Sequence, residues 1–288
     1  MKLLLTGADG QFGRCLQDRA GDHQLIALNR HGLDITDAKA VSDCLQQHRP
    51  DIVINGAAYT DVDRAESEPE KAYAVNRDGA ANLAHACAKL DIPLIHISTD
   101  YVFDGTATTP YKPNDPTNPI NVYGKSKLAG EEAIREIWPK HLIIRTSWLF
   151  SEYGNNFVKT MLRLAKERDE ISVVNDQVGC PTYAGHLAEV ALVLLDVSRW
   201  GTCHVVGDPA ISWHGFANAI RKAASEQKHL QCLPRIIPIS TTEYPTAALR
   251  PLHSQLASTV VLDGHSSSYD LNWNTALDRV LASLKSSF

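Results

Sequence analysis

The sequence of 288 residues predicts an α/β fold, a doubly wound parallel sheet followed by a smaller C-terminal α/β domain. The chain begins with a short apolar segment at residues 3–5, which leads directly into a glycine-rich turn. Further apolar segments follow and alternate with helical patterns, as is typical of parallel strands joined by helices. The strands expected after the first are residues 25–28, 50–55, 94–97 and 142–146.

The composition is that of an ordinary globular protein, with 44% hydrophobic residues, 21% charged residues and a formal net charge of −5. This acidic balance lacks the basic excess of nucleic-acid-binding proteins. The longest apolar segment, residues 190–195, is far too short to cross a bilayer. The N-terminus reads as a strand rather than a signal peptide. We therefore expect a cytoplasmic protein that binds neither nucleic acid nor membrane.

The six cysteines are scattered along the chain and form no Cys-x-x-Cys pair. This usage is typical of reduced thiols in a cytosolic protein. Metal binding through cysteine is therefore not expected.

Three glycines follow the first expected strand: Gly7, Gly10 and Gly13. The first permits a tight turn, the second lets the backbone approach a pyrophosphate, and the third allows close packing of a helix on the strand. Gln11 and Phe12 begin that helix, whose first amides would point at phosphate charge. Between a strand and a helix, this spacing predicts a Rossmann-type dinucleotide site. The alternative is a glycine-rich turn that binds nothing.

Asn29 and Arg30 stand just past the second expected strand, where an NAD-selective site would carry an acidic residue. An amide does not repel a 2′-phosphate, and a guanidinium can bind one through two hydrogen bonds. We therefore predict NADPH as cofactor and leave the use of NADH open, the alternative being that Arg30 is a solvated loop charge. Asp34 and Ile35 are expected at the edge and face of the adenine.

The next two expected strands end in small or polar residues. Ala57, Ala58 and Tyr59 follow the third strand, where small residues let the backbone pass close to a cofactor. Thr99 and Asp100 follow the fourth, whose nearly continuous apolar character is typical of a strand covered on both faces. Because the carboxyl ends of parallel strands meet at one edge, all these residues should face one crevice.

Tyr123 and Lys127 lie four residues apart in an expected helix and therefore on the same face. A free tyrosine has a pKa of about 10, and a neighbouring ammonium lowers it by favouring the phenolate. Such a pair can act as a general acid or base. The pair alone could equally be a solvated helix face without chemistry, so its place after the preceding segments is what favours a catalytic role.

The C-terminal half alternates helical patterns with short strands and contains no internal repeat. We assign residues 1–147 to a cofactor-binding domain, to which some later segments return, and residues 148–288 mainly to a substrate domain. Helices are expected at 68–89, 156–167, 184–197, 213–225 and 273–284, and short strands at 171–174, 204–206 and 235–239.

These features together resemble the extended short-chain dehydrogenase/reductase family and, within it, the dTDP-4-dehydrorhamnose reductases. The similarity runs from residue 1 to about residue 256 and is weak over the last thirty residues. Besides the glycine turn and the Tyr123-x-x-x-Lys127 pair, it rests on residues 55–58, 98–105, 121–131, 145–148, 154–157, 175–177 and 250–251.

The resemblance implies reduction of the C4 ketone of dTDP-4-dehydro-L-rhamnose by NADPH, in the biosynthesis of cell-wall or O-antigen polysaccharide. It implies that Tyr123 donates the proton, and that Lys127 holds the nicotinamide ribose and lowers the tyrosine pKa. It further implies that Thr99 hydrogen-bonds the substrate oxygen. Asn76 matches an asparagine that keeps a water near the lysine in related enzymes, the alternative being a helix asparagine that points at solvent.

The resemblance also implies which residues bind the nucleotide sugar. Trp148 would form a wall for the sugar, although a core tryptophan is the alternative, and residues 175–177 would hold the deoxynucleotide. The expected substrate-binding residues are Thr99, Asp100, Tyr123, Trp148, Asn156, Asn175, Gln177 and Arg250.

Two positions depart from some relatives, which bridge two subunits with a metal held by acidic residues. The aligned positions here are Cys15 and Gly185, and a thiol is a poor ligand for Mg²⁺. We therefore expect no bound metal, and a monomer or weak homodimer without a metal bridge.

Two other functions remain open at this stage. A nucleotide-sugar 4,6-dehydratase or 4-epimerase of the same fold would retain NAD⁺. A dehydratase needs Asp-Glu after its threonine, whereas Tyr101 follows Asp100 here, and the serine pair of epimerases is also missing. A non-catalytic regulatory subunit, such as that of methionine adenosyltransferase, could retain the fold, but the intact Thr99, Tyr123 and Lys127 argue against it.

Overall fold

The computed structural model describes residues 1–196, 200–230, 233–258 and 271–285. Within these ranges the main feature is a six-stranded sheet in which all neighbouring strands run parallel. This confirms the predicted doubly wound α/β fold. From one edge to the other, the strands are β10 (Gly201–His204), β5 (His141–Thr146), β4 (Leu94–Thr99), β3 (Ile52–Asn55), β1 (Lys2–Thr6) and β2 (Gln24–Leu28).

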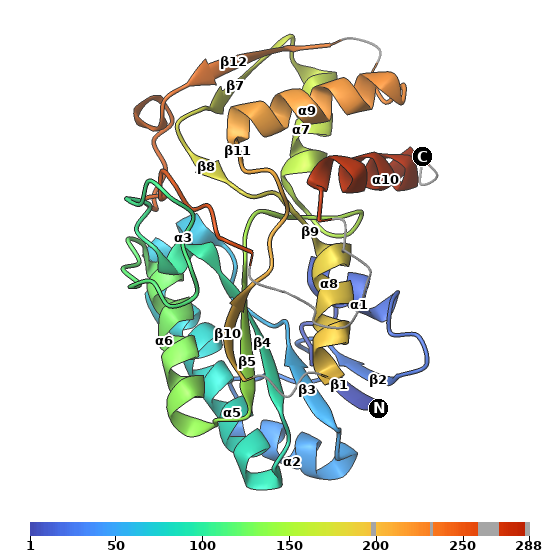
Figure 1. The fold of residues 1–288 in the computed structure, drawn as a ribbon, viewed down its shortest axis with the longest axis vertical. Helices are drawn as coiled ribbons and strands as arrows, with labels where there is room; N and C mark the ends of the chain where they lie inside the picture. The colour runs from blue at the N-terminus through green and yellow to red at the C-terminus, as the bar shows by residue number, and fades with distance from the viewer. Residues whose placement is uncertain (197–199, 231–232, 259–270, 286–288) are drawn as a thin grey trace.

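Helices cover both faces of this sheet (Figure 1). Successive side chains of a strand point to opposite faces, so Leu3 and Leu5 of β1 join one buried cluster and Leu4 joins the other. The first cluster lies beneath two helices and the second beneath three. In that order they are α1 (Gln11–Gln17), α8 (Ala184–Val193), α2 (Ala38–His48), α5 (Gly79–Leu90) and α6 (Val122–Ile137).

The order of the strands reverses at β1. This strand pairs with both β2 and β3, so the chain first builds toward one edge and then crosses to build the other half. In open parallel sheets, the loops at the carboxyl ends diverge at such a reversal and leave a crevice for a ligand. The glycine turn that follows β1 lies at this position.

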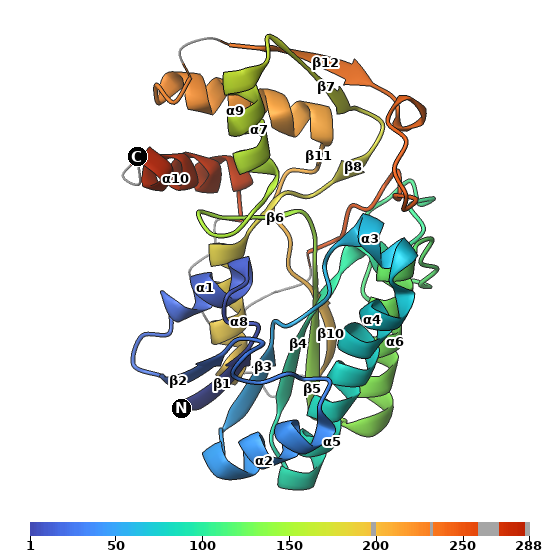
Figure 2. The same cartoon turned by 180° about the vertical axis from the view of Figure 1, so that it is seen from behind.

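A smaller lobe lies beyond the carboxyl ends of the sheet (Figures 1 and 2). It has its own buried cluster, which includes Phe150, Phe216 and Trp273. Its elements are α7 (Phe157–Glu167), α9 (Trp213–Glu226) and α10 (Trp273–Lys285), and the strand pairs β12 (Arg235–Ile239) with β7 (Glu170–Val174), β11 (Ile211–Ser212) with β8 (Val178–Gly179), and β6 (Leu149–Phe150) with β9 (Thr182–Tyr183).

Two elements from the second half of the chain lie on the main sheet. Helix α8 packs against α1, and β10 pairs with β5 at the sheet edge. The strand expected at 204–206 therefore begins earlier, at residue 201, because residues 201–204 are the ones that pair with β5. The domain boundary at residue 147 stays a prediction.

The helix expected at residues 68–89 is interrupted. It consists of α4 (Pro69–Tyr73), a π-helical turn at Ala74–Asp78, and α5. A π turn adds a residue to the helical repeat, which sequence periodicity does not register. The turn contains Asn76, whose side chain is buried, so the solvent-facing alternative for this residue is wrong.

Neither a membrane span nor a disulfide is found in the described part of the chain. Among the described residues, no helix is both long and apolar enough to cross a membrane. The five cysteines in these ranges are free thiols, and Cys232 lies outside them. The short helical elements are α3 (Val62–Ser67), η2 (Asp100–Val102), η3 (Leu194–Asp196) and η4 (Thr241–Glu243).

Candidate active site

A cleft of about 770 Å³ opens at the carboxyl ends of β1, β3, β4 and β5. A cavity of this size is typical of sites for small organic ligands. Every residue expected to bind the cofactor lines it, from the glycine turn to Lys127. Four residues expected to bind the substrate line it too: Thr99, Asp100, Tyr123 and Trp148.

The glycine turn packs against the loop after β3 with no room for side chains. Gly7 has a φ of +73°, and a Cβ there would meet the Ala57 nitrogen at 2.5 Å. A Cβ on Gly13 would meet the Gly7 carbonyl at 2.3 Å. On Gly10 the nearest atom to a Cβ would be 3.3 Å away, so this position opens on the cleft. Gly7 and Gly13 thus build the turn, and Gly10 leaves space in front of it.

Arg30 lies at the end of the cleft beyond β2 and is nearly free. Its side chain is 82% exposed, and Nε lies 3.9 Å from Asp34 Oδ2. Asn29 is held more firmly, because its Nδ2 donates to Asp9 and its Oδ1 accepts from backbone amides in the same turn. The guanidinium is therefore available to a phosphate group without breaking a strong ion pair.

Tyr123 and Thr99 come together from two elements. Tyr123 lies in the first turn of α6, which begins at Val122. Asn121 caps this helix, and its side chain accepts from the Gly124 amide. Thr99 ends β4, and its hydroxyl hydrogen-bonds the Tyr123 phenol. A Cβ on Gly124 would lie 2.1 Å from the Tyr101 carbonyl, so the glycine lets α6 approach the end of β4.

The pKa of Tyr123 is opposite to the expectation. Burial raises it to about 12, the hydrogen bond with the Thr99 hydroxyl lowers it, and Asp100 raises it further. Lys127 instead donates to the Ile97 carbonyl at 2.8 Å. Lys127 therefore does not lower the tyrosine pKa here, and the phenol keeps its proton at neutral pH.

Asp100 is a second buried acid in the cleft. Its side chain is 2% exposed, and Oδ1 accepts from the Thr99 hydroxyl at 3.1 Å. Burial raises the pKa of Asp100 to about 7, so the carboxyl can hold a proton close to neutral pH. The carboxyl also hydrogen-bonds the Ser254 side chain, and this contact lowers the pKa of Asp100 against the effect of burial.

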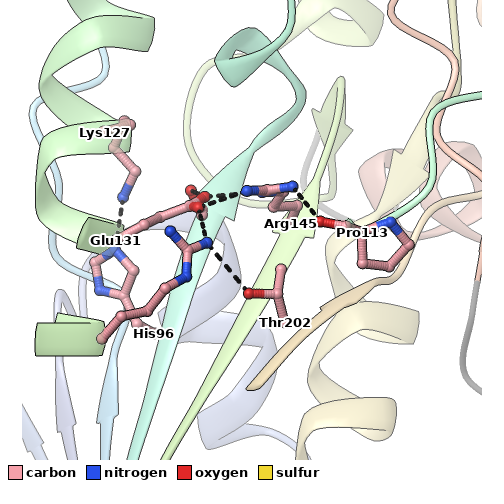
Figure 3. Close-up of polar contacts among 8 residues, drawn as sticks. His96, Pro113, Lys127, Glu131, Arg145 and Thr202 are labelled. Atoms are coloured by element: carbon pink, nitrogen blue, oxygen red, sulfur yellow. Dashed lines mark hydrogen bonds and ion pairs between the residues drawn. The ribbon is translucent and has the colours of Figure 1, made fainter. Parts of the chain in front are cut away.

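Behind Lys127, a buried ion pair joins α6 to the sheet (Figure 3). Glu131 accepts from Arg145 at 2.7 and 3.0 Å, from Arg135 at 2.6 Å, and from the Ser98 hydroxyl at 2.5 Å. Sequence reasoning missed this pair. The available signal was an arginine that directly follows the apolar run of residues 142–144, because a buried guanidinium must find a partner.

Trp148 stacks on Trp213 at the other side of the cleft. The ring centroids are 3.5 Å apart and the planes differ by 6°. Trp148 has a φ of +47°, an uncommon backbone conformation for a bulky residue. A Cβ on Gly179 would lie 2.6 Å from the Trp148 indole, so a glycine is required beneath the ring. Trp213 lines the cleft as well. Sequence reasoning missed this residue, because no local pattern connects it with Trp148.

Asn76 connects the cofactor loop to α6. Its Oδ1 accepts from the Tyr59 amide at 2.8 Å, and its Nδ2 donates to the Tyr59 carbonyl and to Ser126 Oγ. These contacts use the oxygen and both hydrogens of the amide. The side chain therefore has no hydrogen left to donate to a water. The expected role of Asn76, to hold a water near Lys127, stays a prediction that these contacts do not favour.

Two of the residues expected to bind the substrate, Asn156 and Gln177, contact other elements instead. Neither is among the described residues that line the cleft. Asn156 caps α7, and its Nδ2 donates at 2.9 Å to Gln11, which does line the cleft. Gln177 donates to Thr241 Oγ1 at 3.1 Å.

Asn175 and Arg250 also lie outside the described lining of the cleft. Asn175 Oδ1 accepts from Ser212, the residue before α9. Arg250 forms an ion pair with Asp63 of α3, with contacts of 2.7 and 3.1 Å. The structure thus brings the residues expected to bind the cofactor and those expected to be catalytic into one cleft, and leaves four of the eight expected substrate residues outside its described lining.

Fold and cleft together define a dinucleotide-binding α/β protein of the extended short-chain dehydrogenase/reductase class. The chain belongs to the family described as RmlD substrate binding domain, whose model matches residues 1–286. A dTDP-4-dehydrorhamnose reductase of Aggregatibacter actinomycetemcomitans is 43% identical over 290 residues, and the match covers 98% of each chain.

Two solved structures are similar over nearly the full length. A dTDP-4-dehydrorhamnose reductase of Clostridium acetobutylicum has a TM-score of 0.92 at 38% identity, over 99% of this chain and 100% of that one. A dTDP-4-dehydrorhamnose reductase of Bacillus anthracis, solved in complex with NADP, has a TM-score of 0.91 at 40% identity, over 98% and 99% of the two chains.

Proposed function

We propose that this chain reduces the C4 ketone of dTDP-4-dehydro-L-rhamnose to dTDP-L-rhamnose with NADPH, in the cytoplasm, as a step of polysaccharide biosynthesis. The observation that carries the proposal is that Thr99, Tyr123 and Lys127 line the same cleft as the complete set of predicted cofactor residues. The names and the near-complete coverage of the relatives support it.

The cleft fits a dinucleotide with a 2′-phosphate. Gly10 leaves room for a pyrophosphate in front of the turn, and Arg30, which is paired only weakly with Asp34, offers a guanidinium beside Asn29. Ala57 and Ala58 form a small-residue wall between these ends. When bound, NADPH supplies the hydride for the carbonyl carbon.

The chain's own residues supply the proton and hold the carbonyl. Tyr123, with a pKa of about 12, carries the proton at neutral pH and donates it to the C4 oxygen as the alkoxide forms. Thr99 orients the phenol and hydrogen-bonds the same oxygen. Lys127, whose pKa burial lowers to about 8 against the opposing effect of Glu131, is mainly an ammonium at neutral pH and is therefore an acid that can return a proton to the phenolate that remains.

The sugar and nucleotide would lie toward the smaller lobe. The Trp148–Trp213 stack offers a flat apolar wall there, a surface that suits the apolar face of a deoxysugar ring. Asp100 and Thr99 offer polar contacts opposite it. Asn156, Asn175, Gln177 and Arg250 would take part only if their present contacts rearrange, and they stay predictions.

We also propose that the protein forms no metal-bridged dimer. Arg19 occupies the region between Cys15 and Gly185, where it donates to Glu189 at 2.9 Å and to the Tyr183 hydroxyl at 3.0 Å. A Cβ on Gly185 would lie 2.5 Å from this guanidinium. An acidic side chain does not fit at this position, and a fixed cation disfavours a metal ion. Activity and apparent molecular mass in solution should therefore be unaffected by EDTA.

The function is tested by mixing the purified protein with NADPH and dTDP-4-dehydro-L-rhamnose generated in situ, and following nicotinamide absorbance. We expect oxidation by the wild type and a loss of kcat of about 10²–10⁴-fold in Tyr123→Phe, because the proton donor is gone. NADPH binding, measured by fluorescence titration, should be retained in the variant. Tyr101→Phe, a change of the neighbouring tyrosine ring, is the matched control and should keep most of the activity.

A folded wild-type protein that binds NADPH but does not oxidise it with this substrate would contradict the proposal. The regulatory-subunit alternative would then be next, and a search for a partner would follow. Transformation of a nucleotide sugar without net NADPH oxidation would instead favour the epimerase or dehydratase alternative.

A further inference from the structure

His96 connects the cofactor side of the cleft to Lys127. It lies on β4, is 1% exposed, and its two ring nitrogens contact different side chains. Nδ1 lies 2.9 Å from Asn55 Nδ2, and Nε2 lies 3.3 Å from Lys127 Nζ. Figure 3 shows the Lys127 side chain directed at the imidazole ring. Nothing in the proposed mechanism uses this histidine.

Asn55 determines which nitrogen of His96 carries the proton. The backbone amide of Ala57 can only donate, and it lies 3.0 Å from Asn55 Oδ1, which also accepts from Thr6 Oγ1 at 2.7 Å. That side of the Asn55 amide is therefore the oxygen, and its NH2 group faces His96. Since an NH2 group only donates, Nδ1 must accept, and a neutral ring then carries its proton on Nε2.

The Nε2–H bond of His96 therefore points at Lys127 Nζ. An ammonium has three donors and no lone pair, so it cannot accept this hydrogen bond, whereas a neutral amine can. Nζ also donates to the Ile97 carbonyl at 2.8 Å, which both forms of the lysine can do. The contact with His96 is thus the one that discriminates between ammonium and amine.

We propose that His96, held as the Nε2–H tautomer by Asn55, is a positioning residue that stabilises the neutral amine of Lys127. The proposal rests on the proposed function, in which Tyr123 becomes a phenolate after protonating the C4 oxygen. When the phenolate is neutralised, an N–H bond of Lys127 breaks and its proton passes toward the phenolate oxygen. The lysine nitrogen keeps the electron pair, and His96 donates to it.

Charges on α6 oppose this effect. Burial lowers the pKa of Lys127 to about 8, while Glu131, one turn further along the helix, raises it. Glu131 is itself held by Arg145 and Arg135, whose positive charges compensate its negative charge and weaken its effect on Lys127. The lysine thus lies between a negative group that favours the ammonium and an N–H group that favours the amine.

The ring of His96 stays neutral in this environment. Burial holds its pKa well below the usual value, and the positive charges of Lys127, His141 and Arg135 act in the same direction. A doubly protonated ring would also place Nδ1–H against the NH2 group of Asn55. His96 is therefore a fixed donor to Lys127 throughout the working pH range.

The proposal is tested on apo protein labelled with ¹⁵N-lysine, by following the Lys127 Nζ resonance with pH; Lys127→Arg identifies the signal. His96→Gln places an amide oxygen within reach of Nζ, which favours the ammonium, so the pKa of Lys127 should rise by about one unit. His96→Leu removes the donor and adds no acceptor, so a smaller rise is expected. His141→Gln, the other buried histidine near this pair, should leave the pKa unchanged.

An unchanged Lys127 pKa in His96→Gln, or a fall in His96→Leu, would overturn the proposal, because burial alone would then determine the value. A second measurement uses the wild-type protein, so its result does not depend on whether a variant folds. Long-range ¹H–¹⁵N spectra of histidine-labelled wild type should show His96 neutral, with the proton on Nε2, and a proton on Nδ1 would refute the argument.

Kinetics give an independent readout. In His96→Gln, the limb of the kcat profile that reports Lys127 should move to higher pH by the same shift, with the KM for NADPH nearly unchanged. A purely structural role of His96 would lower kcat at every pH without moving the limb. Since the NMR titrations require no turnover, failure of the wild type to oxidise NADPH would count against the proposed function and leave the test of His96 intact.

Discussion

Arg30 and Asp100 lie in opposite environments within one cleft. The guanidinium of Arg30 is 82% exposed and weakly paired, so it interacts with a ligand only through screened charge and hydrogen bonds. Asp100 is buried, and removal from water changes its proton affinity. The residue proposed to bind the far end of the cofactor is therefore solvated, whereas the acid beside the proposed catalytic residues is buried.

Replacement of Arg30 should separate the two nicotinamide cofactors. In Arg30→Ala, we expect the KM for NADPH to rise about tenfold, because one exposed charge-assisted contact is lost. The KM for NADH should stay unchanged. Arg30→Lys should recover part of the loss, because an ammonium keeps the charge but not the fork of donors. Steady-state kinetics with both cofactors measure this. Equal changes for NADPH and NADH would show that Arg30 does not contact a 2′-phosphate.

Asp100 should make stability depend on pH. Its pKa is raised from 3.8 to about 7 in the folded protein, so the protonated form favours folding. This contribution is complete below about pH 4 and is lost as the pH rises through about 7. Asp100→Asn, which cannot ionise, should therefore gain stability relative to wild type over this interval, by up to about 4 kcal/mol.

Urea unfolding of both proteins at several pH values measures this difference. Other titrating groups are shared and cancel in the comparison. A difference between the two proteins that does not change with pH would show that Asp100 is ionised in the folded state.

At the scale of elements, α6 is the most constrained part of the site. Its first turn is capped by Asn121 and packs on η2 through Gly124. One turn past Lys127, a Cβ on Gly130 would lie 2.0 Å from the Asn76 carbonyl, so the helix also packs directly on the π turn. Next to this glycine, Glu131 binds Arg145 of β5. Tyr123 and Lys127 thus lie on a helix fixed at three points.

The Glu131–Arg145 pair should be costly to break from one side. Glu131→Gln leaves the Arg145 guanidinium buried without a carboxylate, so we expect a loss of about 3–5 kcal/mol in the free energy of unfolding. Arg145→Met should cost less, because Arg135 remains to pair with Glu131. Chemical denaturation of both variants tests the order. The reverse order would mean that Arg135 contributes little to holding the carboxylate.

At the scale of the whole molecule, the cleft lies between the sheet and the smaller lobe. Segments 148–150 and 178–183 join the two, and the segment around residue 250 returns across α3. The Asp63–Arg250 ion pair is partly exposed, which limits its contribution to stability. Its position next to Val62, which lines the cleft, gives it more influence on the geometry of binding.

Loss of this ion pair should affect binding more than stability. In Asp63→Asn, we expect a change of less than about 1 kcal/mol in the free energy of unfolding and a several-fold higher KM for the nucleotide sugar, with kcat nearly unchanged. Asp43→Asn, which breaks an exposed ion pair lying wholly on α2, is the matched control and should leave both quantities unchanged. An unaltered KM in Asp63→Asn would contradict a role of the pair at the cleft.

The fold and the cofactor side of the site were predictable because their signals are local. Gly7, Gly10 and Gly13 lie within a single turn, and each parallel strand is a continuous apolar run. His96 and Trp213 were not found, because each acts through a partner distant in the chain: Asn55 and Lys127 for the first, Trp148 for the second. No periodicity encodes such a pairing.

The substrate side shows the same limit. Arg250 was expected from resemblance, but its partner Asp63 lies in another element, and only the folded chain shows that the guanidinium is already engaged. The sign of the Tyr123 pKa was also missed. Sequence spacing reveals a neighbouring lysine but not the burial that outweighs it.

The position of β10 at the edge of the main sheet has a consequence for biosynthesis. As the chain leaves the ribosome, β5 emerges with one side of its backbone unpaired, and its partner is translated only after the whole α7–α8 region. An exposed parallel edge is a template for wrong pairing with another nascent chain. The sheet that the first half begins is therefore completed only after residues 201–204 have been translated, and we expect ribosome-bound fragments that stop before Gly201 to depend on chaperones.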